Sequence, residues 1–285
     1  MFGVGVGIRV GGFTPISGVA PYVGLLDSYP GASAAYSVRL LKSDYTGSAI
    51  RVRRSSDNAE QDIGFSGGNL DTSALTSFCG AGNGFVTTWY DQSGNGYNTT
   101  QGTAANQPQI VSSGSVLTTN GKPSANFDGS NDFLATTGTP FSATETTLIA
   151  VSKLNNVGPY LRLFCIGAYD DGRYLGSNTL TDDMLAIFNN TTLTCFGGVA
   201  ITQNVSIMYN NGTSGVLWQN GSQVNTVTAN NSSYGNENLY IGSDKVQGTS
   251  EFWNGIGQEF IFYPSSQSSN VSGIGSNINT YYGIY

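Results

Sequence analysis

Several acidic and amide side chains of this sequence are spaced closely enough to do chemistry together. The segment FDGSNDF (127–133) places Asp128, Asn131 and Asp132 within one short turn. Clustered carboxylate and amide oxygens are the ligands that calcium prefers. The same residues also favour a strand-joining turn held by side-chain-to-backbone hydrogen bonds. We therefore expect no cofactor and no metal, with calcium at this turn as the alternative.

A second set of polar and aromatic residues could bind a sugar. A sugar site on a β domain needs an aromatic ring with an apolar face and nearby Asp or Asn side chains that hydrogen-bond to hydroxyls. The ligand-binding candidates are Asp183, Trp218, Tyr240, Asp244 and Trp253. Because large aromatic rings are usually well buried, each of these three rings also has an interpretation as part of the core.

The segment RVRRSSDNAEQDIGF (51–65) holds the densest group of charges in the chain. Its apolar residues alternate on either side of SSDNAE, which is typical of two strands joined by a turn. Its three arginines, Arg51, Arg53 and Arg54, would then face acids of the same hairpin. We interpret the segment as a structural hairpin with exposed ion pairs, each contributing about 0–1 kcal/mol.

The composition excludes several kinds of site. Histidine is absent from the 285 residues, which excludes a Ser-His-Asp triad, a Cys-His pair and zinc sites with His ligands. The cysteines Cys79, Cys165 and Cys195 lie far apart and form no zinc motif. A formal net charge of −7 argues against a nucleic-acid partner. The sequence has no apolar stretch of about 18 residues, so we expect no membrane span.

Short strands would position most of these residues. From residue 84 onward, apolar runs alternate with turns rich in Gly, Asn and Ser, which predicts an antiparallel β-sandwich or jelly roll. The dipeptide Asn220-Gly221 between two such runs predicts a tight hairpin. Short helices are predicted over 31–45 and 71–80, and the tail after residue 268 reads as a short helix or turn.

The N-terminal residues have a pattern of their own. Phe2, Val4, Val6, Ile8 and Val10 alternate mostly with glycine, which predicts a strand with one apolar face and one nearly bare face. The face that carries glycine would allow another backbone to approach closely. The segment also lacks the basic residues with which a signal peptide begins, so we do not interpret it as one. We divide the chain into an attachment arm, 1–30, and one β domain, 31–285.

Two groups of motifs resemble known families. The segments FDGSNDFL (127–134), GVLWQNGSQV (215–224) and LYIGSD (239–244) resemble the laminin G-like, or concanavalin A-like, jelly roll. The segments 34–65 and VTTWYDQSGNGYN (86–98) resemble the start of the α-L-arabinofuranosidase B catalytic domain. The combination of these two groups of segments also resembles that of phage virion proteins. The resemblance implies an all-β fold, a concanavalin A-like (laminin G-like) sandwich with one or two short helices and an N-terminal arm.

The arabinofuranosidase resemblance also implies roles for individual residues. Retaining glycosidases need two carboxyl groups, an acid/base and a nucleophile. The family's acid/base position matches Asp244, but its nucleophile position matches Leu185 in MLAIF (184–188), which cannot form a glycosyl ester. Asp183 lies two residues earlier, roughly 6–7 Å along a strand. The family's adjacent cysteine pair is reduced to Cys165. The resemblance therefore implies that the chain has no complete catalytic set.

These features predict a non-enzymatic phage virion structural protein, a head or tail fibre, appendage or decoration protein that displays a lectin-like domain. It would lie on the virion surface after synthesis in the host cytoplasm and could bind a host surface glycan. We expect a homo-oligomer, with a trimer favoured, attached to other virion proteins through residues 1–30. The alternatives are a free soluble, extracellular lectin and a glycoside hydrolase related to α-L-arabinofuranosidase. In the hydrolase, Asp244 would be the acid/base and Asp183 or Glu251 its partner.

Overall fold

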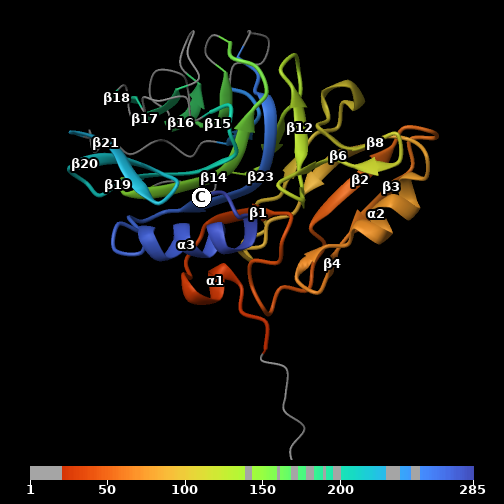
Figure 1. The fold of residues 1–285 in the computed structure, drawn as a ribbon, viewed down its shortest axis with the longest axis horizontal. Coiled ribbons are helices and arrows are strands. Elements are labelled where there is room, and N and C mark those ends of the chain that lie inside the picture. Colours follow the sequence, from red (N-terminus) through yellow and green to blue (C-terminus); the bar gives the residue numbers. More distant parts are fainter. Residues whose placement is uncertain are drawn as a thin grey trace, which may run out of the picture.

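The chain folds into an all-β sandwich in the computed structural model (Figure 1). The structure describes residues 21–138, 143–158, 161–167, 173–177, 183–188, 191–194, 200–228, 238–244 and 251–285. The helices in this part of the chain are α1 (Leu25–Ser28), α2 (Thr72–Cys79) and α3 (Val271–Tyr282), with a 3-10 turn at Ala104–Asn106. The all-β fold class predicted from the sequence is confirmed.

The described strands are short and numerous. The first are β1 (Ala34–Ser37), β2 (Ile50–Arg54), β3 (Glu60–Ile63), β4 (Phe65–Ser66), β5 (Asn69–Leu70), β6 (Gly84–Trp89), β7 (Thr99–Thr100), β8 (Gln109–Ser112), β9 (Ser115–Val116), β10 (Thr118–Thr119), β11 (Lys122–Pro123), β12 (Ala125–Asp128) and β13 (Leu134–Thr136). They are followed by β14 (Thr146–Leu154), β15 (Arg162–Ile166), β16 (Arg173–Ser177), β17 (Met184–Phe188), β18 (Thr191–Thr194), β19 (Asn204–Asn210), β20 (Ser214–Gln219), β21 (Ser222–Thr228), β22 (Leu239–Ile241) and β23 (Asn254–Tyr263).

The strand pairings define two layers. One layer runs β21–β20–β19–β14–β23, and β23 pairs further with β1 and β12. The other runs β3–β2–β6–β7–β13–β22–β15–β16–β17–β18. All of these pairs are antiparallel, and β8 links the layers by pairing with both β6 and β12.

Aromatic side chains fill the space between the layers. Trp89 of β6 meets Phe260 of β23 edge-to-face at 5.7 Å, and Phe164 of β15 meets Phe262 of β23 at 5.3 Å. All four rings are buried. Such contacts contribute about 0.5–1.5 kcal/mol each beyond the burial of apolar area. The core between the layers therefore rests on β23, whose residues from Gly255 to Tyr263 are all buried.

The helices were predicted with mixed success. α2 is confirmed, with Asp71 accepting a hydrogen bond from the Ala74 amide at 2.9 Å and Gly80 ending the helix at a positive φ. α3 confirms the predicted tail helix and lies with α1 below the β14 and β23 layer, away from β15–β18 (Figure 1). The helix predicted over 31–45 is wrong. Its Ala-rich start is instead β1, which is buried and paired along β23.

The two predicted hairpins are confirmed, with one correction. β20 and β21 turn at Asn220 and Gly221, both at positive φ. β2 and β3 pair as expected, and Arg51 reaches Asp62 at 2.8 Å on the surface. The prediction that all three arginines face acids is wrong for Arg53, which is buried and donates to Gln107 Oε1 at 2.7 Å.

The N-terminal segment is only partly described. Residues 1–20, which include the predicted strand Phe2–Val10, lie outside the described residues. Leu25 and Leu26 of α1 are buried in the same core as the β layers. The division into an arm and one domain therefore stays a prediction, although the described core reaches back to residue 25. None of the described helices is long and apolar enough to cross a membrane.

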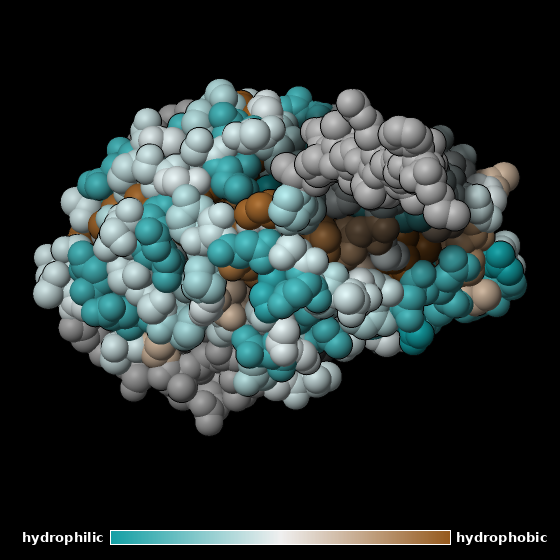
Figure 2. All heavy atoms as spheres, turned by 90° about the horizontal axis from the view of Figure 1, so that it is seen from below, coloured by the Kyte–Doolittle hydropathy of each residue, from teal (hydrophilic) through white to brown (hydrophobic). Residues whose placement is uncertain are grey.

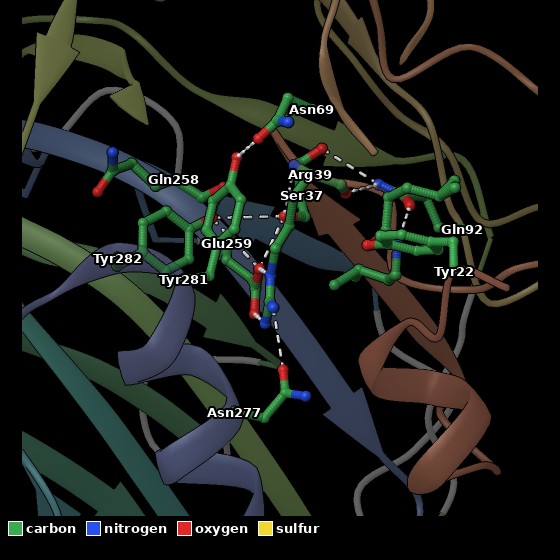
Figure 3. Close-up of polar contacts among 12 residues, drawn as sticks. Tyr22, Ser37, Arg39, Asn69, Gln92, Gln258, Glu259, Asn277, Tyr281 and Tyr282 are labelled. Carbon is green, nitrogen blue, oxygen red and sulfur yellow. Dashed lines mark hydrogen bonds and ion pairs between the residues drawn. The ribbon is translucent and has the colours of Figure 1, made fainter. Parts of the chain in front are cut away.

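A buried polar network fastens α3 to the sandwich (Figure 3). Arg39 donates to both carboxylate oxygens of Glu259 on β23, at 2.7 and 2.9 Å, and to Asn277 of α3 at 2.9 Å. Ser37 donates to the same carboxylate at 2.8 Å, and Tyr282 does so at 3.2 Å. Since these groups are buried and satisfy one another, we interpret the network as structural.

Candidate functional site

Two acidic residues from separate segments meet at one end of the second layer. Asp244 lies three residues after β22 and is buried. Glu251 lies just before β23, is half-buried, and its carboxyl group is hydrogen-bonded to that of Asp244. Paired carboxyl groups of this kind are what acid–base and glycosyl-transfer chemistry needs. The structure thus joins Asp244, predicted from the family pattern, to Glu251, which was its alternative partner.

A buried arginine holds the pair. Arg162 at the start of β15 is 0% exposed, and its Nη2 lies 3.2 Å from Glu251 Oε2. Its guanidinium lies over the Tyr174 ring, 3.8 Å from the ring centre. Its backbone amide also donates to the Glu251 carbonyl oxygen at 3.2 Å. Glu251 is therefore fixed to β15 by both its main chain and its side chain.

Neighbouring strands explain why these residues converge. β22 pairs with β15 so that Tyr240 lies opposite Cys165, and β15 pairs with β16 so that Cys165 lies opposite Tyr174. After β22 the chain turns at Gly242, which has a φ of 91° and accepts from the Trp253 amide at 2.9 Å. A side chain at this position would meet the Phe127 ring at 2.4 Å, so glycine is required there. This turn places Asp244 beside Glu251.

The environment of the pair favours one shared proton. Burial raises the pKa of Glu251, the negative charge of Asp244 raises it further, and Arg162 opposes both effects. Two carboxylates in contact cannot both be ionised at low cost. We therefore expect the pair to resist losing its last proton more strongly than an isolated glutamate does.

Leu185 and Asp183 lie close to this arrangement. Leu185 is 7% exposed and forms a small cluster with Cys165 and Tyr174, the residue that supports Arg162. Asp183, directly before β17, is buried. The family's nucleophile position is therefore an apolar contact beside the site. The acid predicted as its substitute remains a candidate.

The three aromatic candidates have different surroundings. Tyr240 is half-buried, lies in the row with Cys165, and contacts Phe133 at 6.4 Å between ring centres. Trp253 is 0% exposed and belongs to the core, so it cannot present a ring face to a sugar. Trp218 is half-buried on β20, in the other layer of the sandwich. Of the three, only Tyr240 lies in the strand that leads to Asp244.

The FDGSNDF segment forms a turn. The Asp128 side chain accepts from the amides of Ser130 at 2.8 Å and Asn131 at 3.2 Å, and Asp132 accepts from the Asp128 amide at 3.0 Å. This is the Asx-type turn expected from the sequence. Within the described ranges, no group of three or more His, Cys, Asp or Glu residues could hold a metal ion. Calcium binding here stays an untested alternative.

Asp132 makes stability depend on pH. Burial raises its pKa to about 7 from an ordinary value of 3.8, and the Asp128 charge adds to the effect. Because the folded state binds this proton more tightly than the unfolded state, the stabilisation is complete below about pH 4 and is lost as the pH rises through 7. We expect the free energy of unfolding to be on the order of 2 kcal/mol lower at pH 8 than at pH 5.

Urea unfolding of wild type and Asp132→Asn at the two pH values measures this effect. The asparagine keeps the acceptor for the Asp128 amide but has no proton to lose, so its stability should change less between pH 5 and 8. Equal pH dependence in both proteins would show that another group is responsible.

A cavity elsewhere in the fold offers different chemistry. It has a volume of about 510 Å³ and is lined by Leu26, Pro30, Gly31, Ala32, Ser33, Lys42, Ser93, Asn95, Tyr97 and Pro264. Asn95 donates to the carbonyls of Ala32 and Ser33, and Ser93 donates to Asp91, so these groups serve the fold. None of the described residues that line it carries a carboxyl group, so acid–base chemistry rests with the Asp244–Glu251 pair.

Sequence reasoning missed Arg162 and Tyr174. One signal was available, because an arginine inside the apolar run YLRLFCIG must be paired if that strand is buried.

Comparison with known proteins supports a glycoside-hydrolase-like β-sandwich. The sequence model of the family described as alpha-L-arabinofuranosidase B, catalytic, matches residues 27–126. The matched segment holds the predicted family motifs and ends before the carboxylate pair. No curated protein matches the sequence.

Three solved structures share the fold. An arabinofuranosidase complexed with arabinofuranosyl-α-1,2-xylobiose is 19% identical, with a TM-score of 0.69, over 87% of this chain and 62% of that chain. A GH54 α-L-arabinofuranosidase soaked with a cyclic sulfate inhibitor is 17% identical, with a TM-score of 0.70, over 89% and 64%. A point variant of a GH54 α-L-arabinofuranosidase, soaked with 4-nitrophenyl α-L-arabinofuranoside, is 17% identical, with a TM-score of 0.71, over 89% of this chain and 64% of that chain. This chain spans less than two thirds of those structures.

These findings define the class of fold and correct the functional prediction. The chain is a glycoside-hydrolase-like β-sandwich. The prediction of a non-enzymatic phage virion protein is wrong, because the matching family model and the three similar structures are all arabinofuranosidases. That prediction relied on the loss of the nucleophile at Leu185, on the N-terminal strand and on the absence of a signal peptide, and it left Glu251 as a partner of Asp244 only in the hydrolase alternative. The alternative, a glycoside hydrolase, fits the findings better.

Proposed function

We propose that this protein is a glycoside hydrolase that releases arabinofuranosyl residues, and that Asp244 and Glu251 carry the reaction. The observation that carries the proposal is the hydrogen-bonded carboxyl pair, held by a fully buried arginine in an arabinofuranosidase-like fold. A buried charged pair of acids is costly to maintain, and such groups gather at functional sites.

The chemistry follows from the single proton on the pair. Glu251 gives its proton to the leaving oxygen while the bond from the anomeric carbon to that oxygen breaks. Asp244 forms an ester with the same carbon. Water then attacks this carbon, Glu251 takes the water's proton, and the ester bond to Asp244 breaks. This assignment reverses the acid/base role that the family resemblance implies for Asp244; it is supported by the direction in which burial and the Asp244 charge move the pKa of Glu251, which is upward.

Hydrogen-bond contact between the acids favours a retaining mechanism. Inverting enzymes keep their two carboxyl groups roughly 6.5–9.5 Å apart to leave room for a water molecule, whereas retaining enzymes keep them roughly 5–5.5 Å apart, which is nearer to the contact seen here. The contact between Asp244 and Glu251 leaves no such room. We therefore expect the released sugar to keep its anomeric configuration.

The substrate class rests on the comparisons. Two of the similar structures hold arabinofuranosyl compounds, one an arabinofuranosyl xylobiose and the other an aryl arabinofuranoside. The half-buried Tyr240, in the row beside the pair, is the ring we assign to the sugar. Oligomeric state and glycan partners beyond this class stay predictions.

A panel of 4-nitrophenyl glycosides tests the proposal. Purified wild type should release nitrophenol from the α-L-arabinofuranoside and much more slowly from the β-D-xylopyranoside and β-D-galactopyranoside. The Asp244→Asn/Glu251→Gln double variant, purified identically, controls for contaminating hydrolases. A preference for either pyranoside would contradict the substrate class.

A further inference from the structure

We propose that Arg162 is a positioning residue of this site, which fixes Glu251 against Asp244. This inference rests on the proposed function. It assigns to Arg162 no contact with substrate, because the guanidinium is 0% exposed and contacts both Glu251 and the Tyr174 ring.

The first support is the double attachment of Glu251. Arg162 meets its carboxylate with Nη2 at 3.2 Å and its carbonyl oxygen with the backbone amide at 3.2 Å. In addition, Arg162 and Phe252 form a parallel β-bridge. One residue of β15 thus sets both the position of the chain that carries Glu251 and the direction of its side chain.

The second support is the rigidity behind the guanidinium. The Tyr174 ring lies 3.8 Å below it, and Arg162 lies opposite Gly176 in the β15–β16 pairing. A side chain at Gly176 would come within 2.1 Å of the Leu161 carbonyl oxygen, so glycine is needed for the backbones to approach here. The planar guanidinium is thereby held from one side by a ring and from the other by an acid.

The third support is the charge balance. The charged groups acting on Glu251 within the described chain are Arg162 from β15 and Asp244 from the segment after β22. One arginine, two carboxyl groups and one proton sum to zero charge, which suits a buried site. Without the arginine, both ionisations of the pair should move to higher pH, because the cation that lowers the pKa of Glu251 is lost.

Arg162→Met and Arg162→Lys test this role. For Arg162→Met we expect both limbs of the kcat/KM–pH profile to move upward by about one pH unit or more, with kcat reduced by about tenfold or more and KM changed by less than about twofold. Arg162→Lys keeps the charge and should restore most of the profile. The exposed Arg51→Met is the matched control and should behave as wild type.

A measurement without turnover separates this inference from the proposed function. Carboxyl ¹³C NMR of the labelled acids follows the titration of Asp244 and Glu251 in each variant. A shift in Arg162→Met without sugar release by wild type would sink the proposed function and leave the positioning role intact. An unchanged titration and profile in Arg162→Met would overturn the positioning role. If Arg162→Met does not fold, Tyr174→Leu replaces it in the test, because this change removes the ring beside the guanidinium but no charge. We expect Tyr174→Leu to move the titration and the kcat/KM–pH profile upward by less than Arg162→Met would, and no shift would overturn the positioning role.

Discussion

Glu251→Gln is expected to slow hydrolysis of alkyl α-L-arabinofuranosides by about 10²–10⁴-fold, because an alkoxide leaves poorly without a proton. The first step on 4-nitrophenyl α-L-arabinofuranoside should be nearly unaffected, because nitrophenolate leaves without one. The second step still needs a base for water, so the variant should release a burst of nitrophenol equal to the enzyme concentration and then stall. Stopped-flow absorbance measures the burst.

Asp244→Asn gives the complementary result. The amide cannot form the ester, so we expect both the alkyl and the nitrophenyl substrate to lose about the same large factor, with no burst. A burst in Asp244→Asn together with complete loss in Glu251→Gln would contradict our assignment. It would return the acid/base role to Asp244, as the family resemblance implies.

Arg39→Met is expected to destabilise the protein by about 3–5 kcal/mol. The change leaves the Glu259 carboxylate, which is 0% exposed, without its cation and removes the link to Asn277 of α3 (Figure 3). The double variant Arg39→Met/Glu259→Gln should recover a large part of this loss, because no charge then remains buried. Urea unfolding followed by tryptophan fluorescence measures both.

An exposed ion pair of the same chain is the control. Arg51 reaches Asp62 at 2.8 Å with both side chains more than 40% exposed, so Arg51→Met should cost no more than about 1 kcal/mol. Equal losses in Arg39→Met and Arg51→Met would show that the Arg39 network does not fasten α3 to the sandwich.

Much of the sandwich could be predicted because local signals agree with the fold. The Asn220-Gly221 turn, the Asp71 cap of α2 and the alternation of the β2–β3 hairpin depend on near neighbours only. β1 was mistaken for a helix because its burial comes from β23, more than 200 residues away. Arg53 was placed wrongly because the groups that cover it, Gln107 Oε1 and the Ala104 carbonyl oxygen, come from a segment about 50 residues further along the chain.

The site could be predicted only in part. Asp244 was named as a candidate because it follows a recognisable strand motif, and Leu185 has no carboxyl group with which to attack a sugar. The conclusion drawn from Leu185 failed because Glu251 approaches through the parallel bridge between Arg162 and Phe252, a pairing that no sequence spacing indicates. The buried setting that raises the pKa of Glu251 is likewise a property of the folded chain.

The outer surface carries no comparable signal. The face in Figure 2 is mostly hydrophilic, and its largest group of apolar side chains lies in a hollowed band, in a chain with net charge −7 and many Asn and Ser residues. Charge density in the sequence pointed to residues 51–65, where the exposed pairs contribute little. The charged residues on which the candidate site and the α3 network depend, Arg162 and Arg39, are instead buried.

The initial rate of nitrophenol release from 4-nitrophenyl α-L-arabinofuranoside tests the central claim most directly. Three proteins are compared: wild type, Asp244→Asn/Glu251→Gln, and Asp44→Asn/Glu60→Gln, which removes the same charges from exposed positions. We expect wild type and the exposed-site variant to turn over at equal rates and the pair variant to fall to the uncatalysed rate. If wild type released nitrophenol no faster than the uncatalysed reaction, or if all three proteins released it at the same rate, Asp244 and Glu251 would not carry the proposed hydrolysis.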